Sequence, residues 1–268
     1  MFLIKTENGL GQDDVYDVSH SLMAVPDETL FYRHMHPHCE LLLFIRGDAD
    51  YFIDGNCYRL HPYDLLLIPE GIYHYLTLRS AAQYENYVVN FRESLLPGGT
   101  VRRLFEGPNV FNIGADTELM GLFSRLDLCH SLYGWEDFRC AAACLVQEIL
   151  LYCAYAKRTP APASEKRSEL LADTLRYIDA HLEDDLDAEI LAEALTISRS
   201  HLQNVFSERM QIGLKQYIMQ KKILAAHRDL LGGMAAGDAA ARYRFGDYST
   251  FYRLYRKTFG ASPSDAHP

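Results

Sequence analysis

The pattern of the sequence changes near residue 160, from short strand-like segments to continuous helical periodicity. The first hundred residues hold short runs rich in β-branched, leucine and aromatic side chains, separated by turn signals such as Asp54-Gly55. An Asp-Gly pair between two such runs is a strong hairpin signal, and many short strands at this spacing are typical of a sandwich or barrel. From residue 168 onward the pattern is helical. In a chain of 268 residues, this division favours two domains of different fold class.

A helical hairpin and a polar segment separate these two parts. Across residues 117–156, apolar side chains recur at alternating spacings of three and four, with Gly134 at the break, which predicts an αα-hairpin. Residues 157–167 are polar and contain two prolines, which predicts an interdomain linker. We therefore expect a β-rich domain over residues 1–156 and an all-α domain over residues 168–268. The apolar seam of the hairpin favours a homodimer interface; the alternative is that it packs only on its own domain.

The basic side chains are concentrated at the end of the chain, although the net charge of the whole chain is −10. Residues 1–164 carry a net −9 and residues 165–197 a net −7. Residues 198–268, in contrast, carry 11 basic and 5 acidic side chains, a net +6. Such asymmetry favours a segment that faces nucleic acid, with a solvated basic surface as the alternative.

Three further features narrow the class of protein. No run approaches eighteen consecutive apolar residues, so we expect no membrane span. The first residues lack a basic stretch followed by a long apolar stretch, so no signal peptide is expected and the predicted location is cytoplasmic. The six cysteines include no CxxC pair, which disfavours a zinc ribbon or a redox dithiol.

Two stretches of the helical part resemble each other and lie 49 residues apart. Each has four apolar side chains on one helix face, with the same spacing: Leu202, Val205, Phe206 and Met210 in the first, and Phe251, Leu254, Tyr255 and Phe259 in the second. A short alanine-rich helix and a tight turn precede each stretch. A short helix, a tight turn and a second helix with one apolar face make a helix-turn-helix unit. The sequence therefore predicts two such units.

The opposite face of each second helix carries side chains of types that can pair with DNA bases. In the first unit these are Arg199, Ser200, His201, Gln203 and Asn204, and in the second they are Tyr248, Ser249, Thr250, Tyr252 and Arg253. Glutamine and asparagine pair with adenine, arginine pairs with guanine, and lysines such as Lys222 and Lys257 suit phosphates. One such helix is equally well explained as the solvated face of a bundle. Two copies in a region of net +6 favour binding to double-stranded DNA.

Three segments of this region, residues 186–206, 217–226 and 245–264, together resemble the DNA-binding domain of AraC-type transcriptional regulators. In that family each unit enters a major groove on one face of the DNA. The resemblance implies that the base-proximal positions are Ser200, Gln203 and Asn204 in the first unit and Tyr248, Ser249, Thr250, Tyr252 and Arg253 in the second. It further implies an operator as partner, RNA polymerase as a possible second partner, and an activator. Two positions depart from the family, because both turns usually carry glycine but hold Thr196 and Arg244 here.

The β-rich part resembles a cupin barrel in two motifs. His34-x-His36-x3-Glu40 is followed by Gly47, and Pro69-x-Gly71-x2-His74 comes later. The resemblance implies a jelly-roll barrel, in which His34, His36, Glu40 and His74 are ligands of a metal ion. Three imidazoles and a carboxylate suit divalent iron, manganese, nickel or zinc. The second motif departs from the family where its leading glycine is Tyr63 and its trailing asparagine is Leu78.

The same polar side chains have a second interpretation, as the lining of a site for an organic effector. Alternation along a strand would place His34, His36, His38 and Glu40 on one face, and Tyr51 is one of several aromatic residues near the motifs. Aromatic faces with a few convergent polar groups suit sugars, and a barrel interior is a common small-molecule site.

Three functions are compatible with these features of the sequence. The favoured one is a DNA-binding transcription regulator, not an enzyme, whose cupin-like domain binds a small-molecule effector. A metal-dependent cupin enzyme with a helical interaction module is the alternative, but it leaves the doubled helical unit unexplained. A constitutive DNA-binding protein whose cupin-like domain serves only for dimerisation is the third.

Overall fold

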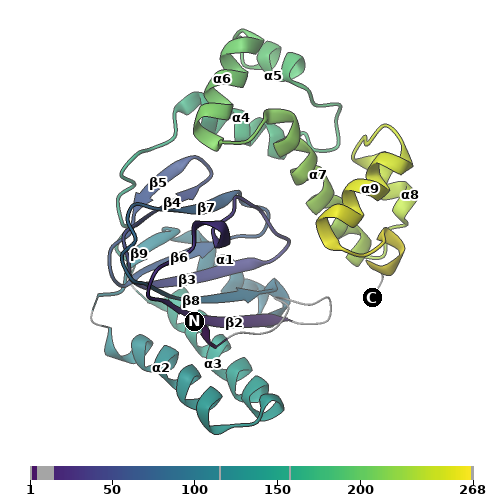
Figure 1. Cartoon of the computed structure of the whole chain (residues 1–268). Helices are drawn as coiled ribbons and strands as arrows, with labels where there is room; N and C mark the ends of the chain where they lie inside the picture. The colour runs from purple at the N-terminus through teal and green to yellow at the C-terminus, as the bar shows by residue number, and fades with distance from the viewer. Residues whose placement is uncertain (1, 5–14, 115, 157, 267–268) are drawn as a thin grey trace. The chain divides into compact units, whose positions relative to one another are not determined.

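The structure is a computed structural model that describes residues 2–4, 15–114, 116–156 and 158–266. The chain divides into two compact units, residues 1–165 and 166–268 (Figure 1). All of the described strands lie in the first unit, whereas the described part of the second unit is helical.

Two antiparallel sheets form the first unit. The larger sheet has the strand order β1 (Phe2–Ile4), β2 (Tyr16–Met23), β8 (Tyr84–Phe91), β3 (Cys39–Arg46), β6 (Asp64–Ile68) and β9 (Val110–Asn112). The smaller sheet has the order β5 (Asn56–Arg59), β4 (Ala49–Ile53) and β7 (His74–Leu78). The predicted hairpin at Asp54-Gly55 is confirmed: it joins β4 to β5, with positive φ angles of 46° and 79° at these two residues.

The two sheets share an apolar core but remain separate in their hydrogen bonding. Leu42 and Phe44 of β3 pack with Tyr51 and Ile53 of β4 in this core. Within the described residues, strand pairing therefore gives a two-sheet sandwich, and not the closed barrel that the cupin resemblance implies. The physical reason is that no described strand of one sheet pairs with a strand of the other, so the two sheets meet through side-chain packing.

Helices cover the other face of the larger sheet. They are α1 (Gly98–Glu106), α2 (Thr117–Leu132) and α3 (Trp135–Tyr155), and α2 and α3 form the predicted αα-hairpin (Figure 1). Leu41 and Leu43 alternate with Leu42 and Phe44 along β3, and they face a second core that contains Phe123 of α2 and Ile149 of α3. Much of the apolar seam of the hairpin is thus buried against its own domain.

Among the described helices, α3 is long and apolar enough to cross a membrane by length and composition alone. Its most apolar window has a mean hydropathy of 1.3, and 44% of that window is buried inside the protein. Phe138, Val146 and Ile149 pack in the core against the larger sheet. This combination is that of a core helix, which a simple count of apolar residues does not distinguish from a membrane span.

The described residues of the second unit form helices joined by turns. They are α4 (Glu169–Ala180), α5 (Ala188–Ala194), α6 (Arg199–Met210), α7 (Leu214–Leu231), α8 (Ala236–Arg242) and α9 (Tyr248–Phe259). The two predicted helix-turn-helix units are confirmed as α5 with α6 and α8 with α9, and α7 lies between them in the chain. Phe206 of α6 and Phe251 of α9 are fully buried, as the apolar spacing predicts.

Side-chain caps fix where the second helix of each unit begins. Ser198 accepts a hydrogen bond from the backbone N–H of His201, and Asp247 accepts one from Thr250. Such N-caps satisfy backbone N–H groups that have no partner inside the helix. The first turn of the second helix in each unit is therefore held by a residue just outside it.

Both turns contain a residue in the left-handed region: Thr196 has a φ of 57° and Arg244 a φ of 54°. This conformation costs a residue other than glycine about 1–2 kcal/mol. We expect Thr196→Gly to raise the free energy of unfolding of the second unit by about 1 kcal/mol, because relief of the strain exceeds the extra chain entropy of glycine. Thermal unfolding followed by circular dichroism measures this change. Thr196→Ala is the control, since alanine keeps the strain; an equal gain with alanine would contradict the explanation.

Candidate effector and nucleic-acid sites

A cluster of four polar side chains lies at one end of the sandwich. Glu40 is near the start of β3 and His74 starts β7, while His34 and His36 lie in the segment before β3. The backbones of His34 and His74 exchange two hydrogen bonds of 3.2 and 3.0 Å, which hold the two motifs together. Glu40 and His74 are buried, with 7% and 1% of their surface exposed, and His34 and His36 are half-buried.

The three imidazoles of this cluster are oriented in the same way. In each ring, Nδ1 lies 2.8 Å from a backbone carbonyl oxygen: that of Tyr32 for His34, that of His38 for His36 and that of Ile72 for His74. A carbonyl only accepts hydrogen bonds, so Nδ1 must be the donor. Nε2 is then the ring atom that remains for another partner. In metal sites the same second-sphere contact fixes the tautomer of a ligating histidine.

The remaining ligand atoms converge. One ligand atom from each of His34, His36, Glu40 and His74 lies within 4.8 Å of all the others. Oε2 of Glu40 is 3.2 Å from Nε2 of His36 and 3.6 Å from Nε2 of His74, and the Tyr51 hydroxyl donates to Oε1 of Glu40 at 3.2 Å. Nε2 of His74 is a buried polar atom with no hydrogen-bond partner among the described residues. An orphaned buried nitrogen that faces a carboxylate and two further imidazoles fits a metal ion.

The electrostatics of the cluster agree with this donor set. Burial, assisted by the nearby His74, lowers the pKa of His34 to about 4, so this ring is neutral at neutral pH. Burial raises the pKa of Glu40, but His36 and His74 more than offset it, and the pKa ends well below its usual value. Burial lowers the pKa of His74, but the adjacent Glu40 carboxylate more than compensates and raises it. The site therefore holds one negative charge, on Glu40, beside the neutral ring of His34.

One of the predicted lining residues, His38, takes another place, and Tyr63 has an unusual backbone conformation. His38 does not belong to the converging set: its ring stacks on His36 at a centroid distance of 3.8 Å, and burial lowers its pKa to about 3. The predicted strand alternation over residues 34–40 is wrong, because regular pairing of β3 begins only at Cys39. Tyr63, which replaces the leading glycine of the second motif, has a φ of 72°, and this conformation explains why glycine is usual there.

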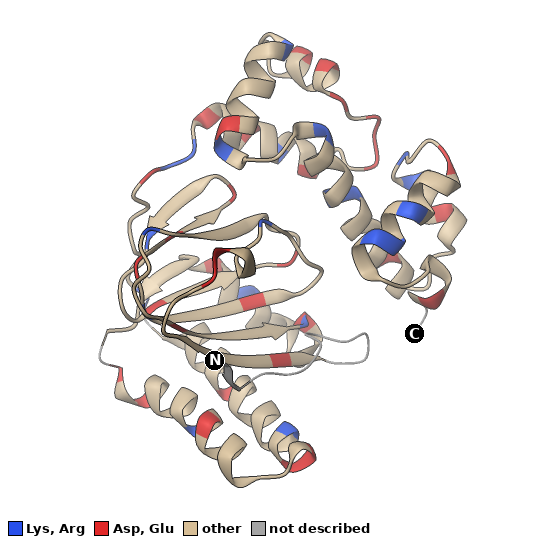
Figure 2. Cartoon of the chain, viewed as in Figure 1, with Lys and Arg blue, Asp and Glu red and all other residues tan. Residues whose placement is uncertain are grey.

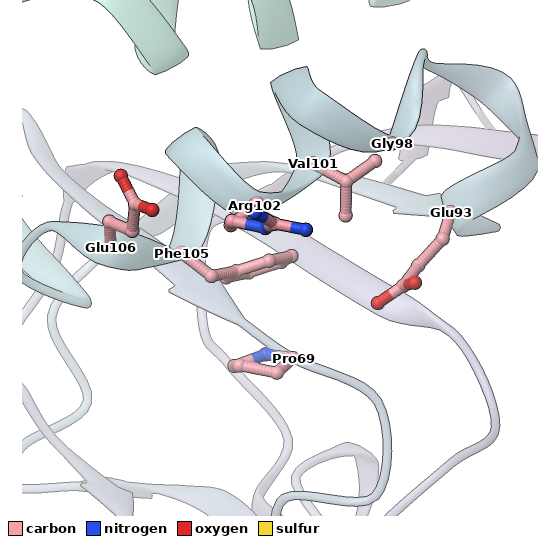
Figure 3. Close-up of a pocket in the computed structure, with 7 residues that line it drawn as sticks. All are labelled: Pro69, Glu93, Gly98, Val101, Arg102, Phe105 and Glu106. Carbon is pink, nitrogen blue, oxygen red and sulfur yellow. The ribbon is translucent and has the colours of Figure 1, made fainter.

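A second hollow lies on α1, away from the cluster, and no sequence signal predicts it. Its volume is about 530 Å³, and its lining consists of Pro69, Glu93, Gly98, Val101, Arg102, Phe105 and Glu106. Arg102 and Phe105 on α1 lie across from Pro69, and Glu93 lies toward one side of the hollow (Figure 3). One cation between two acidic side chains, over an apolar base, gives a surface of mixed character.

The second helix of each unit, α6 or α9, presents to solvent most of the side chains that we predict to read bases. On α6, Ser200, Gln203 and Asn204 are exposed, and so are Arg199 and His201 at its start. On α9, Tyr248, Ser249, Arg253 and Lys257 are exposed, while Thr250 and Tyr252 are half-buried. Basic positions mark α9 in Figure 2. These placements are compatible with DNA reading, and the individual base contacts stay predictions.

Lys222 is placed differently from the prediction. Its side chain is buried, with 3% of its surface exposed, and its ammonium donates to the backbone carbonyl of Asp184 at 2.7 Å. Burial lowers its pKa, and Asp185 and Asp184 oppose that change. The physical reason is its position on α7, four residues from the buried Ile218 and Ala226. Lys222 therefore ties α7 to the loop before α5 and does not face solvent as a phosphate contact.

The comparisons with known proteins agree with both halves of this description. Residues 24–149 match the family described as AraC-like ligand binding domain, and residues 191–267 match a helix-turn-helix domain family. The arabinose operon regulatory protein of Salmonella typhimurium is 25% identical over 240 residues, which cover 84% of this chain and 82% of that protein. The regulatory protein SoxS of Escherichia coli is 28% identical over 98 residues, 36% of this chain and 92% of that protein.

One further relative is matched over a smaller share of its own length, and one solved structure is less similar in sequence. The regulatory protein PocR of Salmonella typhimurium is 30% identical over 108 residues, which cover 40% of this chain and 34% of that protein. The crystal structure of ToxT from Vibrio cholerae covers 94% of this chain and 96% of its own, at 12% identity and a TM-score of 0.41. The two family matches, in the order ligand-binding domain then DNA-binding domain, favour a regulator over the enzyme alternative. The chain belongs to the AraC-type transcriptional regulators.

Proposed function

We propose that this regulator senses its effector at the cluster of His34, His36, Glu40 and His74, and that a divalent transition metal ion is bound there. The observation that carries the proposal is that one ligand atom from each of three imidazoles converges with a buried carboxylate, while Nδ1 of each ring contacts a backbone carbonyl. Iron, manganese, nickel and zinc suit such a donor set. A bound ion would supply a fixed positive charge and, at any open coordination position, a Lewis acid for an effector oxygen.

An organic effector, such as a sugar, is the second candidate for the same place. Tyr51 supports it, because its hydroxyl lies in the core between the sheets and already reaches Glu40. A sugar needs several polar partners at the edge of an apolar wall, and this cluster offers them. The two candidates are compatible, since a metal ion with an open position can itself hold an effector oxygen.

The DNA-binding half is proposed to act on an operator in the cytoplasm as an activator, with RNA polymerase as a further partner. Two helix-turn-helix units in tandem would enter successive major grooves, roughly 34 Å apart. The exposed side chains of α6 and α9 provide the base contacts, and the exposed Lys257 provides a phosphate contact.

A homodimer is proposed to form through the α2–α3 hairpin. Although much of its seam is buried, large apolar side chains remain exposed at its far end and along α3: Leu128, Leu132, Tyr133, Trp135, Leu151 and Tyr155. Several exposed large apolar side chains on one supersecondary unit favour an interaction surface there. An operator with two copies of the binding site would match such a dimer.

Metal binding is tested on the full chain after removal of bound metal. Manganese, iron(II), nickel and zinc are titrated in turn, and bound metal is measured by mass spectrometry and calorimetry. We expect about one equivalent to bind, and His74→Ala to weaken binding by about a hundredfold or more, because it removes the buried central nitrogen. His61→Ala is the control, since this exposed histidine lies outside the cluster. Equal losses in both variants, or no binding at all, would leave the organic effector as the candidate.

A further inference from the structure

Residues 158–165, here called the strap, run along the open edges of both sheets. β9 is the edge strand of the larger sheet and β5 is an edge strand of the smaller one. The backbone N–H of Ala161 donates to the carbonyl of Val110 in β9 at 2.9 Å. Glu165 and Cys57 of β5 exchange two backbone hydrogen bonds of 2.8 and 3.2 Å. The segment predicted as a linker is thus hydrogen-bonded to the sandwich through its backbone at Ala161 and at Glu165.

Arg158 fastens the beginning of the strap to α1. Its guanidinium donates to the backbone carbonyls of Leu104 at 2.7 Å and Arg103 at 3.0 Å, and lies over the ring of Phe111 at 5.4 Å. These carbonyls belong to the last turn of α1, where helical hydrogen bonding ends and a cation is favourable. One side chain therefore satisfies a helix terminus and contacts β9 at the same time.

Gly107 provides the space that Arg158 occupies. A Cβ atom at this position would lie 2.7 Å from both Cζ and Nη2 of Arg158, well inside contact distance. The backbone of Gly107 has a φ of −93°, which other residues adopt without strain. The requirement for glycine here thus comes from Arg158 and not from the turn itself, so a methyl group at residue 107 should displace the guanidinium.

The strap also contacts the apolar core next to the cluster of His34, His36, Glu40 and His74. Ala161 packs against the core between the two sheets, which contains Tyr51, and Tyr51 donates to Glu40. Beyond Glu165 the chain passes directly into the second unit, which begins at Lys166. The strap is therefore in contact with the core that contains Tyr51, the hydrogen-bond partner of Glu40, and is continuous with the DNA-binding unit.

We propose that the strap is the output element of the effector-binding unit, and that Arg158 holds it in the docked state. Effector occupancy would change the equilibrium between docked and released strap, and release would add eight residues to the tether of the DNA-binding unit. Eight extended residues span about 26–29 Å. The coupling to DNA rests on the proposed function. The simpler alternative is a static cover that protects two sheet edges, and hydrogen exchange together with operator binding separates the two.

Hydrogen exchange of the full chain tests the latch. In Arg158→Ala and in Gly107→Ala, we expect the amides of Ala161 and Glu165 to exchange at least tenfold faster, while amides of β3 are unchanged. The double variant should exchange no faster than either single variant, because both remove the same contact. Arg125→Ala, at an exposed arginine of α2, is the control and should change nothing. Unchanged exchange in both single variants would overturn the latch.

Operator binding tests the output role. In the unmodified protein, the metal ion that binds is expected to change the operator Kd, and in Arg158→Ala this response should disappear while the metal Kd stays within twofold. If the strap amides exchange faster in Arg158→Ala but the metal ion still changes the operator Kd of this variant, the strap is a static cover. If the metal ion leaves the operator Kd of the unmodified protein unchanged, the proposal that the metal ion is the effector is wrong. The strap is then judged by the operator Kd alone, which Arg158→Ala should change at least fivefold; a change below twofold would overturn its output role.

Discussion

Acidification of the metal-free protein from pH 7.5 to pH 5 is expected to lower the free energy of unfolding of the first unit by about 2–4 kcal/mol. The cause is the pair His34 and His38, whose pKa values are lowered to about 4 and about 3, chiefly by burial. Between these values and the unfolded value of 6.5, both rings are neutral in the folded chain and protonated in the unfolded chain. Stability therefore falls as pH falls through this window, at about 1.4 kcal/mol per unit and histidine.

The other members of the cluster limit the size of this effect. The pKa of His74 is raised, so its contribution is fully present below pH 6.5 and is lost at higher pH, which opposes the two neutral histidines. The pKa of Glu40 is lowered, so its contribution is lost only below its unfolded value of 4.5, outside the tested range. Two histidines at about 2 kcal/mol each, less the contribution of His74, give the expected range.

Urea unfolding at pH 7.5, 6.5 and 5 measures this loss. Trp135, the single tryptophan of the chain, begins α3 in the first unit, so its fluorescence reports on that unit. His38→Asn should remove about 2 kcal/mol of the pH dependence, whereas His61→Asn should leave it unchanged because His61 is exposed. A stability that stays level between pH 6.5 and pH 5 would show that the two histidines are not held neutral by the fold.

Local patterns in the sequence were sufficient to predict most of the architecture. The Asp54-Gly55 turn and the repeated apolar spacing around Phe206 and Phe251 depend on neighbouring residues, and the structure confirms both. The four-residue cluster is also recovered, although the reason differs from the prediction. His34 and His36 are oriented by backbone carbonyls in an irregular segment, and strand alternation plays no part.

Contacts between distant parts of the chain could not be predicted in the same way. Arg158 and Lys222 both donate to backbone carbonyls, of Leu104 and Asp184 respectively, and a carbonyl leaves no trace in a sequence pattern. For Lys222 there was one usable signal, its spacing of four from Ile218 and Ala226 on the buried face of α7. The strap offered none, because its pairing with two sheet edges depends on how the whole sandwich closes.

Gln203→Ala and Arg253→Ala are expected to relax operator specificity at one position each, by about 1–3 kcal/mol of discrimination between bases. Both side chains are exposed, Gln203 on α6 and Arg253 on α9. Glutamine pairs with adenine and arginine with guanine, so each loss should be confined to that base pair. Operator selection from a random-sequence pool, with the unmodified chain and each variant, measures the base preference position by position.

Lys257→Ala separates this base reading from simple electrostatic attraction. Lys257 is exposed in the last turn of α9, and we expect its loss to weaken binding similarly for all sequences and to lower the salt slope by about one unit.

Arg176→Ala is the matched control for Arg253→Ala, because it removes the same charge from an exposed position on α4. If Arg176→Ala also relaxed the base preference, the effect of Arg253→Ala would not report base reading. If Arg253→Ala only weakened binding uniformly, Arg253 would be a phosphate contact. Recognition by the second unit would then rest on Tyr248, Ser249, Thr250 and Tyr252 alone.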